Sequence, residues 1–381
     1  MRASSLGIFG LIVVAVFTGS CGSAGMQTAL PPPPACTPAS PAPFAYVLSG
    51  FSTATVSSYT LNSCTGALVA TTPPTVSTGI NPEEMVVDPK GRFAYVANLV
   101  SNATDLATIS MYTIDPSSGV LTPTTPPTVP TGFFPQGIAI DPSGEFVYTA
   151  NSDDNTVSMF KVNQSTGVLS ATTPPTVAAG LSPFFVTVHP SGKYVYVSNQ
   201  DDGTVSMYTI NLTTGVLTPM SPPTIVAGSP FGVAVDPTGR FAYTPNTYSN
   251  NTVSQFTIDQ DTGALSPSAI PSVPAGQQPV WVAIDPTGKY GYVVNRGDNT
   301  ISMYTVDANT GNLVPNAPPT IGAGPQPFPV VVDPSGKFVY VADENSEQVA
   351  IFGINSDGTL TPAGAAAAGA GPLSIGIYAP K

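Results

Sequence analysis

One short pattern is repeated along most of this chain, and its spacing restricts the fold more than any other feature. A proline that opens an apolar run recurs every 45 to 53 residues, at Pro82, Pro135, Pro183, Pro230, Pro279, Pro327 and Pro372. A tyrosine in the following apolar run also recurs seven times, at Tyr46, Tyr95, Tyr148, Tyr196, Tyr243, Tyr292 and Tyr340. A fixed period of this length is typical of folds built from repeated supersecondary units.

The copy at residues 135–169 shows what one unit contains. Its first β-branched run ends at Asp141-Pro-Ser-Gly144, whose residue types suit a type I turn. We expect strands at 136–140, 146–150, 156–161 and 168–169. Such a four-stranded sheet cannot bury both faces alone, so neighbouring copies must cover it. The pattern therefore predicts an all-β protein, a β-propeller with four antiparallel strands in each blade.

The two ends of the repeat determine the number of blades. The first complete strand, at 44–48, corresponds to the second strand of a unit, and the last, at 373–377, corresponds to a first strand. The C-terminal strand is therefore expected to complete the N-terminal blade, which leaves no open sheet edge at the closure. This predicts a seven-bladed propeller domain over residues 44–381.

The segment before the repeat indicates export. Residues 1–20 contain Arg2, an apolar run over 6–17, and small residues immediately before Cys21, which is typical of a lipoprotein-type signal peptide. Cys21 would then carry a lipid anchor that holds the protein at the bacterial cell envelope, on the periplasmic or the outer surface. An ordinary cleaved signal is the alternative, whereas a transmembrane anchor is disfavoured because it needs about 20 apolar residues. Residues 21–43 are rich in Pro, Ala and Ser and predict an extended tether.

Two cysteines remain besides Cys21, at Cys36 and Cys64. The strand order brings the end of the tether to the same face of the ring as the turn beside Cys64. A disulfide is therefore one expectation in an oxidising envelope compartment. Two unpaired thiols are the other, because sequence does not give the separation that a disulfide requires.

Charge restricts the partners of the propeller. The chain has 22 acidic and 10 basic residues, for a net charge of −12, and loss of Arg2 with the signal would make it more negative. Nucleic acid and anionic lipid headgroups are therefore excluded as partners of the propeller body. We expect a monomer whose only membrane contact is the lipid anchor.

The repeat also resembles a known family. Residues 333–343 (DPSGKFVYVAD) and 299–313 (NTISMYTVDANTGNL), with their copies, are similar to the seven-bladed lactonase family, whose best-known members are 6-phosphogluconolactonases. Surface-layer propellers with YVTN repeats are a close second. The resemblance covers nearly the whole chain after the tether and implies the blade architecture.

The resemblance also implies where a catalytic site would lie, because enzymes of the family place His, Arg and Glu around the central opening of one face. The only histidine here is His189, which occupies a turn position that is aspartate in other copies. Arg296 is the only basic residue that we place on the face where the first strands begin. A phosphorylated sugar acid would need several cations there.

A candidate site follows from positions where one copy differs from the others. At the second position after each proline, where the channel mouth is expected, one copy has Glu84, with Glu83 beside it, and another has Trp281, the sole tryptophan. If Glu83 and Glu84 are functional, their apolar surroundings should raise the pKa of at least one carboxyl.

The loops on the same face provide a second set of candidates, which carry acidic side chains. These candidate ligand-binding residues are Asp153, Asp154, Asp201, Asp202 and Asp298. Clustered carboxylates can bind calcium or an amine, although the spacing of a dedicated calcium loop is absent and no metal site is predicted. Solvated polar loops are the alternative.

Two classes of function remain open. The first, which we favour from the sequence, is an envelope-anchored module that binds a protein, a glycan or a small molecule with its loop face. The second is a lactone hydrolase that uses Glu83 or Glu84 as general base and Arg296 to polarise the carbonyl.

Overall fold

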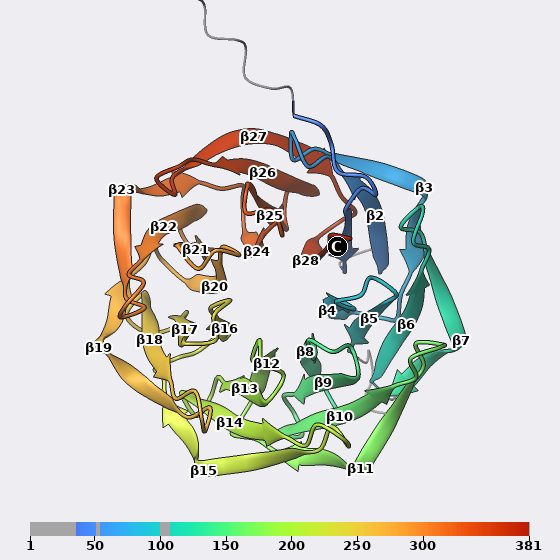
Figure 1. Cartoon of the computed structure of the whole chain (residues 1–381), viewed down its shortest axis with the longest axis horizontal. Helices are drawn as coiled ribbons and strands as arrows, with labels where there is room; N and C mark the ends of the chain where they lie inside the picture. The colour runs from blue at the N-terminus through green and yellow to red at the C-terminus, as the bar shows by residue number, and fades with distance from the viewer. Residues whose placement is uncertain (1–35, 51–53, 100–106, 381) are drawn as a thin grey trace, which may run out of the picture. The chain divides into compact units, whose positions relative to one another are not determined.

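The structure is a computed structural model that describes residues 36–50, 54–99 and 107–380. The predicted signal peptide, Cys21 and residues 21–35 of the predicted tether lie outside these ranges. Thr37–Lys381 form one compact unit. Its described residues fold into seven four-stranded antiparallel sheets, which stand as blades around a central channel (Figure 1). The predicted all-β, seven-bladed propeller is confirmed.

Within each blade, the strands follow one another from the channel outward. The first blade contains β28 (Pro372–Tyr378), β1 (Phe44–Ser49), β2 (Thr55–Leu61) and β3 (Leu68–Ser77). The second contains β4 (Pro82–Val87), β5 (Phe93–Asn98), β6 (Thr108–Ile114) and β7 (Leu121–Pro130). The third contains β8 (Pro135–Ile140), β9 (Phe146–Asn151), β10 (Thr156–Val162) and β11 (Leu169–Ala178). The fourth and fifth contain β12 (Pro183–Val188), β13 (Tyr194–Asn199), β14 (Thr204–Ile210) and β15 (Leu217–Val226); and β16 (Ala234–Val235), β17 (Phe241–Asn246), β18 (Thr252–Ile258) and β19 (Leu265–Pro274). The last two contain β20 (Pro279–Ile284), β21 (Tyr290–Asn295), β22 (Thr300–Val306) and β23 (Leu313–Gly322); and β24 (Pro327–Val332), β25 (Phe338–Asp343), β26 (Gln348–Ile354) and β27 (Leu360–Ala367).

The ring closes as the chain ends predict. β28 pairs antiparallel with β1, so that Ile375 lies opposite Val47 and Ile377 opposite Ala45. Figure 1 shows this pairing as the red C-terminal strand inside the blue N-terminal blade. The first blade therefore has the same four strands as the others.

The core is divided among the interfaces between blades. Every residue of the second strand of each blade is buried, as in β9 and β13. One hydrophobic cluster joins Tyr95 and Met111 of the second blade to Phe160 and Leu169 of the third. A propeller of this length is therefore stabilised by a ring of small cores rather than by one large core.

The repeated tyrosine joins each blade to the next through its hydroxyl group. Tyr95 donates a hydrogen bond of 2.9 Å to the carbonyl oxygen of Gly167, and Tyr196 donates one of 2.7 Å to that of Gly263. At the closure, the Tyr340 hydroxyl donates to the Gly66 carbonyl oxygen at 2.8 Å. These bonds explain why the tyrosine recurs. They also explain why a glycine recurs in the turn between the third and fourth strands of each blade, at Gly66, Gly119, Gly167, Gly215, Gly263, Gly311 and Gly358.

The outermost strands are longer than the sequence predicts. A short strand is expected at 168–169, but β11 extends to Ala178 and includes Pro174 and Pro175. Prolines normally argue against a strand, because they cannot donate a ladder hydrogen bond. They are tolerated here because β11 is the outermost strand, where one edge needs no partner.

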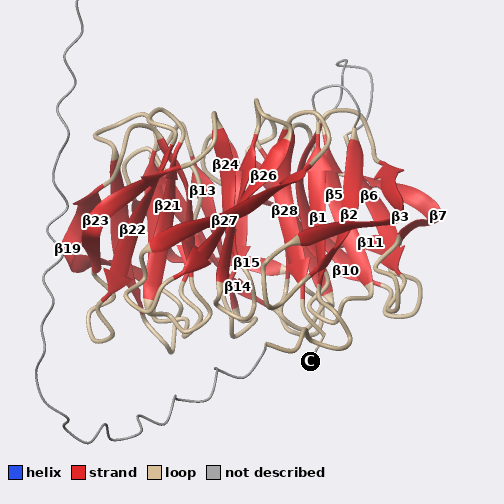
Figure 2. Cartoon of the chain, turned by 90° about the horizontal axis from the view of Figure 1, so that it is seen from above, coloured by secondary structure: helices blue, strands red, loops and turns tan. Residues whose placement is uncertain are grey.

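The loops gather on two opposite faces of the ring, with the strands between them (Figure 2). We call the face on which β4, β8, β12, β20 and β24 begin the mouth face. We call the opposite face, where turns such as 141–144 join the first and second strands, the turn face. The candidate site lies on the mouth face.

Candidate functional site

Two rings of side chains surround the opening of the channel on the mouth face. One comes from the residue that follows the opening proline in six of the blades, and the other from the residue that follows the second strand in four of them. With a few neighbouring residues they line a cavity of about 360 Å³. The lining residues are Gly50, Asn81, Pro82, Glu83, Leu99, Gln136, Phe184, Phe185, Phe231, Arg296, Phe328, Glu344 and Leu373. We call this cavity the mouth cavity.

The backbone before each first strand sets the position of both rings. In six blades the residue before the opening proline has a positive φ, as in Asn81 (46°) and Gln278 (50°). The carbonyl oxygen of Gln278 accepts the backbone N–H of Arg296 at 2.9 Å. This contact brings Arg296, which follows β21, to the edge of the cavity.

The position of the two glutamates differs from the sequence prediction by one residue. The mouth was expected at the second position after each proline, that of Glu84, but the mouth cavity is lined by Glu83 at the first position. Glu84 lines a smaller cavity of about 50 Å³ that it shares with Glu83 and Trp281. The reason is an irregularity of register between Pro82 and Glu84 in the β4–β5 pair, which period-two alternation does not reveal.

Arg296 is held by two neighbours from the seventh blade. Its Nε donates to Oε1 of Gln326 at 2.8 Å, and its Nη2 forms an ion pair with the carboxylate of Glu344. The Arg296 side chain remains 34% exposed, whereas that of Glu344 is 9% exposed. Arg296 can therefore still contact a ligand, although its charge is already balanced.

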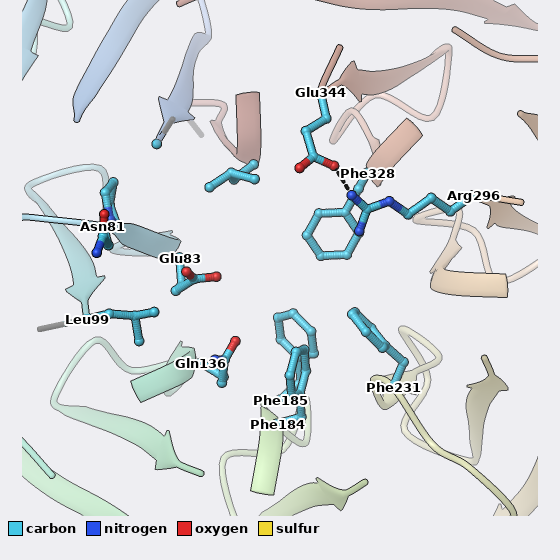
Figure 3. Close-up of a pocket in the computed structure, with 13 residues that line it drawn as sticks. Asn81, Glu83, Leu99, Gln136, Phe184, Phe185, Phe231, Arg296, Phe328 and Glu344 are labelled. Carbon is cyan, nitrogen blue, oxygen red and sulfur yellow. Dashed lines mark hydrogen bonds and ion pairs between the residues drawn. The ribbon is translucent and has the colours of Figure 1, made fainter. Parts of the chain in front are cut away.

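Glu83 faces this pair across the cavity. Figure 3 shows the Glu83 carboxylate and the Arg296 guanidinium pointing into the mouth cavity from opposite sides. Burial, and secondarily the negative charge of Glu344, raises the pKa of Glu83 to about 7. Among the residues that the structure describes, none donates a hydrogen bond to this carboxylate. Glu83 can thus exchange a proton near neutral pH, as a general base or acid requires.

Glu84 has a structural contact instead. Its Oε2 accepts the backbone N–H of Ile138 in the third blade at 2.7 Å. Burial raises the pKa of Glu84 to about 8, and the Ile138 hydrogen bond only partly opposes that rise. Glu84 therefore joins two blades below the mouth, and Glu83 is the better candidate for chemistry.

Trp281 belongs to a group of aromatic rings that the sequence alone did not bring together. Its ring lies 4.7 Å from that of Phe185 and 5.6 Å from that of Phe328, both edge to face. Phe184 and Phe231 extend the group, with 4.5 Å between their ring centroids. The sequence signal for Phe184, Phe231 and Phe328 was the first position after each opening proline. That position reads Glu83, Gln136, Phe184, Phe231, Val280, Phe328 and Leu373.

The acidic loop residues mainly support the backbone of the mouth face. Oδ2 of Asp154, Asp202 and Asp298 accepts the backbone N–H of Phe133, Leu181 and Gln277, respectively, at 2.6 to 2.7 Å. Asp201 accepts the hydroxyl of Ser182, and Asp153 is exposed. In the described ranges, no group of three or more His, Cys, Asp or Glu residues could hold a metal ion. The proposed ligand and calcium roles of these aspartates therefore gain no geometric support.

His189 lies on the turn face, away from the mouth cavity. It is buried, and its ring nitrogens contact the Ser191 hydroxyl and the Gly239 carbonyl oxygen, both at 2.8 Å. Its turn position thus matches its place in the repeat, and catalysis at the mouth cannot use it.

The remaining sequence predictions concern the cysteines and the membrane. Cys36 and Cys64 are both disulfide-bonded. Their pairing with each other stays a prediction, which mass spectrometry of unreduced peptides would test. No helix that is long and apolar enough to cross a bilayer occurs in the described ranges.

Comparison with known proteins identifies the architecture. The family model described as "Lactonase, 7-bladed beta-propeller" matches residues 39–184, 171–284 and 267–376. No curated protein matches the sequence.

Three solved structures illustrate the likeness in fold. A candidate 6-phosphogluconolactonase from Bacteroides fragilis is 21% identical, with a TM-score of 0.73 over 89% of this chain and 98% of the other. One from Bacteroides uniformis is also 21% identical, with a TM-score of 0.75 over 88% and 99%. The periplasmic gluconolactonase PpgL of Pseudomonas aeruginosa is 20% identical, with a TM-score of 0.73 over 89% and 99%. These likenesses concern the fold, and the family match covers most of the sequence, so the chain belongs to the seven-bladed β-propeller lactonase family.

Proposed function

We propose that this propeller is a lactone hydrolase whose site is the mouth cavity. The observation that carries the proposal is that Glu83, whose pKa is raised to about 7, and Arg296 line the same cavity. A base that is half ionised near neutral pH and a cation that can face a carbonyl oxygen are the two groups that ester hydrolysis needs.

The reaction can be written with these two residues. A water molecule attacks the carbonyl carbon of the lactone while the Glu83 carboxylate accepts one of its protons. The carbonyl oxygen becomes an oxyanion, which an N–H of Arg296 stabilises. The ring C–O bond then breaks, and protonated Glu83 returns the proton to the departing alkoxide. The product is a hydroxy acid, and Glu83 is ionised again.

Charge indicates which lactones the cavity would accept. Arg296 is the only cation among the residues that line the mouth cavity, and it is paired with Glu344. Glu83 adds a further carboxyl group. A phosphorylated lactone would bring two negative charges to a site with no free cation, so we expect an uncharged substrate.

The names of similar structures favour this chemistry over others. One of them is a periplasmic gluconolactonase and two are candidate 6-phosphogluconolactonases. They support the reaction class for this chain only through the shared architecture, whereas the residues Glu83, Arg296 and Glu344 are features of its own sequence.

A binding module is the second candidate function. The observation that favours it is the engagement of Arg296 by both Gln326 and Glu344, which leaves fewer of its N–H groups for an oxyanion. In that case the mouth cavity would bind a small molecule, or the loops of the mouth face would bind a protein or a glycan, and neither ligand would be hydrolysed.

Envelope anchoring is part of both proposals. The small residues before Cys21 and the Pro-rich segment after it support a lipid-anchored propeller at the cell envelope. A lactonase there would act on molecules that reach the envelope from outside or from the cytoplasm.

The test is an assay of purified protein on a panel of lactones, with and without calcium. Glu83→Gln should lower kcat/KM by about 10²- to 10⁴-fold, because it removes the general base. The matched control is Glu145→Gln on the turn face, which should retain wild-type activity. Wild-type kcat/KM, corrected for spontaneous hydrolysis, should rise with pH through about 7 as Glu83 ionises. Equal activity of Glu83→Gln and wild type on every substrate would refute the assignment.

A further inference from the structure

We propose that the lactone bound in the mouth cavity carries a hydrocarbon substituent, which lies against the wall formed by Phe184, Phe231 and Phe328. We call this the aromatic wall. The inference rests on the proposed function and names the substrate class for the same site. It predicts an aliphatic, alkyl-substituted lactone rather than a polyhydroxylated sugar lactone.

The aromatic wall occupies one part of the cavity and is continuous. The Phe184 and Phe231 rings are 4.5 Å apart, and the Phe231 and Phe328 rings are 5.8 Å apart. Phe185 contacts all three rings, at 5.2, 5.6 and 6.2 Å. Such a wall offers dispersion and hydrophobic contact but no hydrogen bond.

Most polar groups of the cavity lie away from Phe184 and Phe231, whereas Phe328 lies on the same side of the cavity as Arg296 (Figure 3). Figure 3 shows Phe184, Phe185 and Phe231 together on one side of the cavity, across from Glu344, with Asn81 and Glu83 to one flank. A ligand that fits both parts must therefore have a polar end, such as a lactone carbonyl, and an apolar end.

A sugar lactone does not meet this condition. Its hydroxyl groups are distributed around the ring, so that some would face the aromatic wall without a partner. Each buried hydroxyl that loses its water without gaining a partner weakens binding. An alkyl group at the same place would instead gain free energy when it leaves water.

The wall is fixed before any ligand arrives. The Ser198 hydroxyl accepts the backbone N–H of Phe185 and donates to the carbonyl oxygen of Phe231, both at 3.0 Å. This single side chain therefore joins Phe185, which packs behind the wall in the fourth blade, to Phe231 of the wall in the fifth blade. Phe185 and Phe231 are also buried, at 5% and 8% exposure, so their rings are held in place. A preformed apolar surface gives binding energy without an ordering cost.

Trp281 provides a direct readout of binding. It is the sole tryptophan of the chain and packs edge to face on Phe185 and Phe328. A ligand on the aromatic wall should therefore change its fluorescence. The corresponding lactams keep the ring and the carbonyl but resist hydrolysis, so they measure binding separately from turnover.

The experiment uses the purified protein with δ-lactones that carry no substituent, a methyl, an ethyl or a propyl group, and with the matching lactams. Each methylene should raise kcat/KM for the lactones, and the affinity for the lactams, by about two- to fourfold, because its apolar surface leaves water. A polyhydroxylated δ-lactone should have a lower kcat/KM than the propyl compound.

Variants locate the effect on the wall. Phe184→Gln should abolish most of the preference for propyl over the unsubstituted ring, whereas Phe184→Leu should retain most of it because leucine is still apolar. Phe133→Gln is the matched control, since Phe133 is 41% exposed and does not line the mouth cavity. The chain-length series on wild type decides the question even if a Phe184 variant does not fold.

The outcomes separate this inference from the proposed function. Hydrolysis without dependence on chain length, or a preference for the polyhydroxylated lactone, would overturn the inference and leave the hydrolase. Lactam affinity that rises with chain length, in a protein that hydrolyses no lactone, would support the ligand class and refute the hydrolase. Absence of both hydrolysis and lactam binding would refute both.

Discussion

Replacement of Tyr340 by phenylalanine tests the contact that closes the ring. The Tyr340 side chain is fully buried, and its hydroxyl donates to the Gly66 carbonyl oxygen at 2.8 Å, between the seventh and the first blade. Burial, and secondarily Asp333, raises the pKa of this hydroxyl above its ordinary value, so it is a donor at neutral pH. Tyr340→Phe removes only this oxygen.

The expected cost follows from that geometry. The variant loses one hydrogen bond and leaves the Gly66 carbonyl buried without its donor, which together cost about 1–3 kcal/mol of unfolding free energy. For a domain of this size, the Tm should fall by roughly 2–6 °C. Tyr196→Phe, which breaks the equivalent bond to Gly263, should cost the same to within about 0.5 kcal/mol, because a closed ring makes the two interfaces equivalent.

Urea unfolding with a check of refolding, together with calorimetry, would measure these values. Tyr248→Phe is the control, since Tyr248 is 69% exposed and its loss should change stability by less than about 0.5 kcal/mol. If Tyr340→Phe had no effect while Tyr196→Phe lowered the unfolding free energy, the proposed contact between the seventh and the first blade would be refuted. If neither variant destabilised, the hydroxyl bonds would not hold the blades together.

Three further predictions follow from the same structure. The pKa of Glu84 is 4.5 in the unfolded chain and about 8 in the folded protein, so its contribution to stability is present below pH 4.5 and is lost as the pH rises to 8. Between these pH values, melting curves should show the Tm of Glu84→Gln rising by at least about 5 °C relative to that of wild type. A Tm difference that does not change with pH would contradict the raised pKa. Deletion of 372–381 removes β28 and leaves β1 with an open edge, so the protein should unfold or aggregate; an unchanged Tm would rule out the closure. Cys21→Ala should move the protein from the membrane to the soluble envelope fraction, and a wild type that is already soluble would rule out the lipid anchor.

The sequence determined the architecture because the repeat is a local pattern. The prolines that open the first strands, the buried tyrosines and the turn glycines recur with one period, and each occupies the same position in every blade. The phase of the pattern at residues 44 and 377 also fixed the closure, since it shows which strand each end provides. These features need no knowledge of how two blades contact one another.

The sequence also limited the candidate site without assembling it. Glu83, Glu84, Trp281 and Arg296 were found as departures from the repeat, and all four lie at or just below the channel mouth. The sequence did not show which glutamate lines the mouth cavity. The irregular strand register at the start of β4 places Glu83 there rather than Glu84.

Only the tertiary structure decided the contacts between blades. Arg296 and Glu344 lie 48 positions apart and form an ion pair because they follow the second strands of adjacent blades. The exposed aspartates were equally prominent in the sequence, but Asp154 and Asp202 accept backbone N–H groups of nearby loops instead of forming a metal site. Phe184, Phe231 and Phe328 belong to three blades, and each alone looks like an ordinary strand residue. They form one wall because the ring brings the first strands together around its centre, and that proximity is a property of the closed ring rather than of any segment.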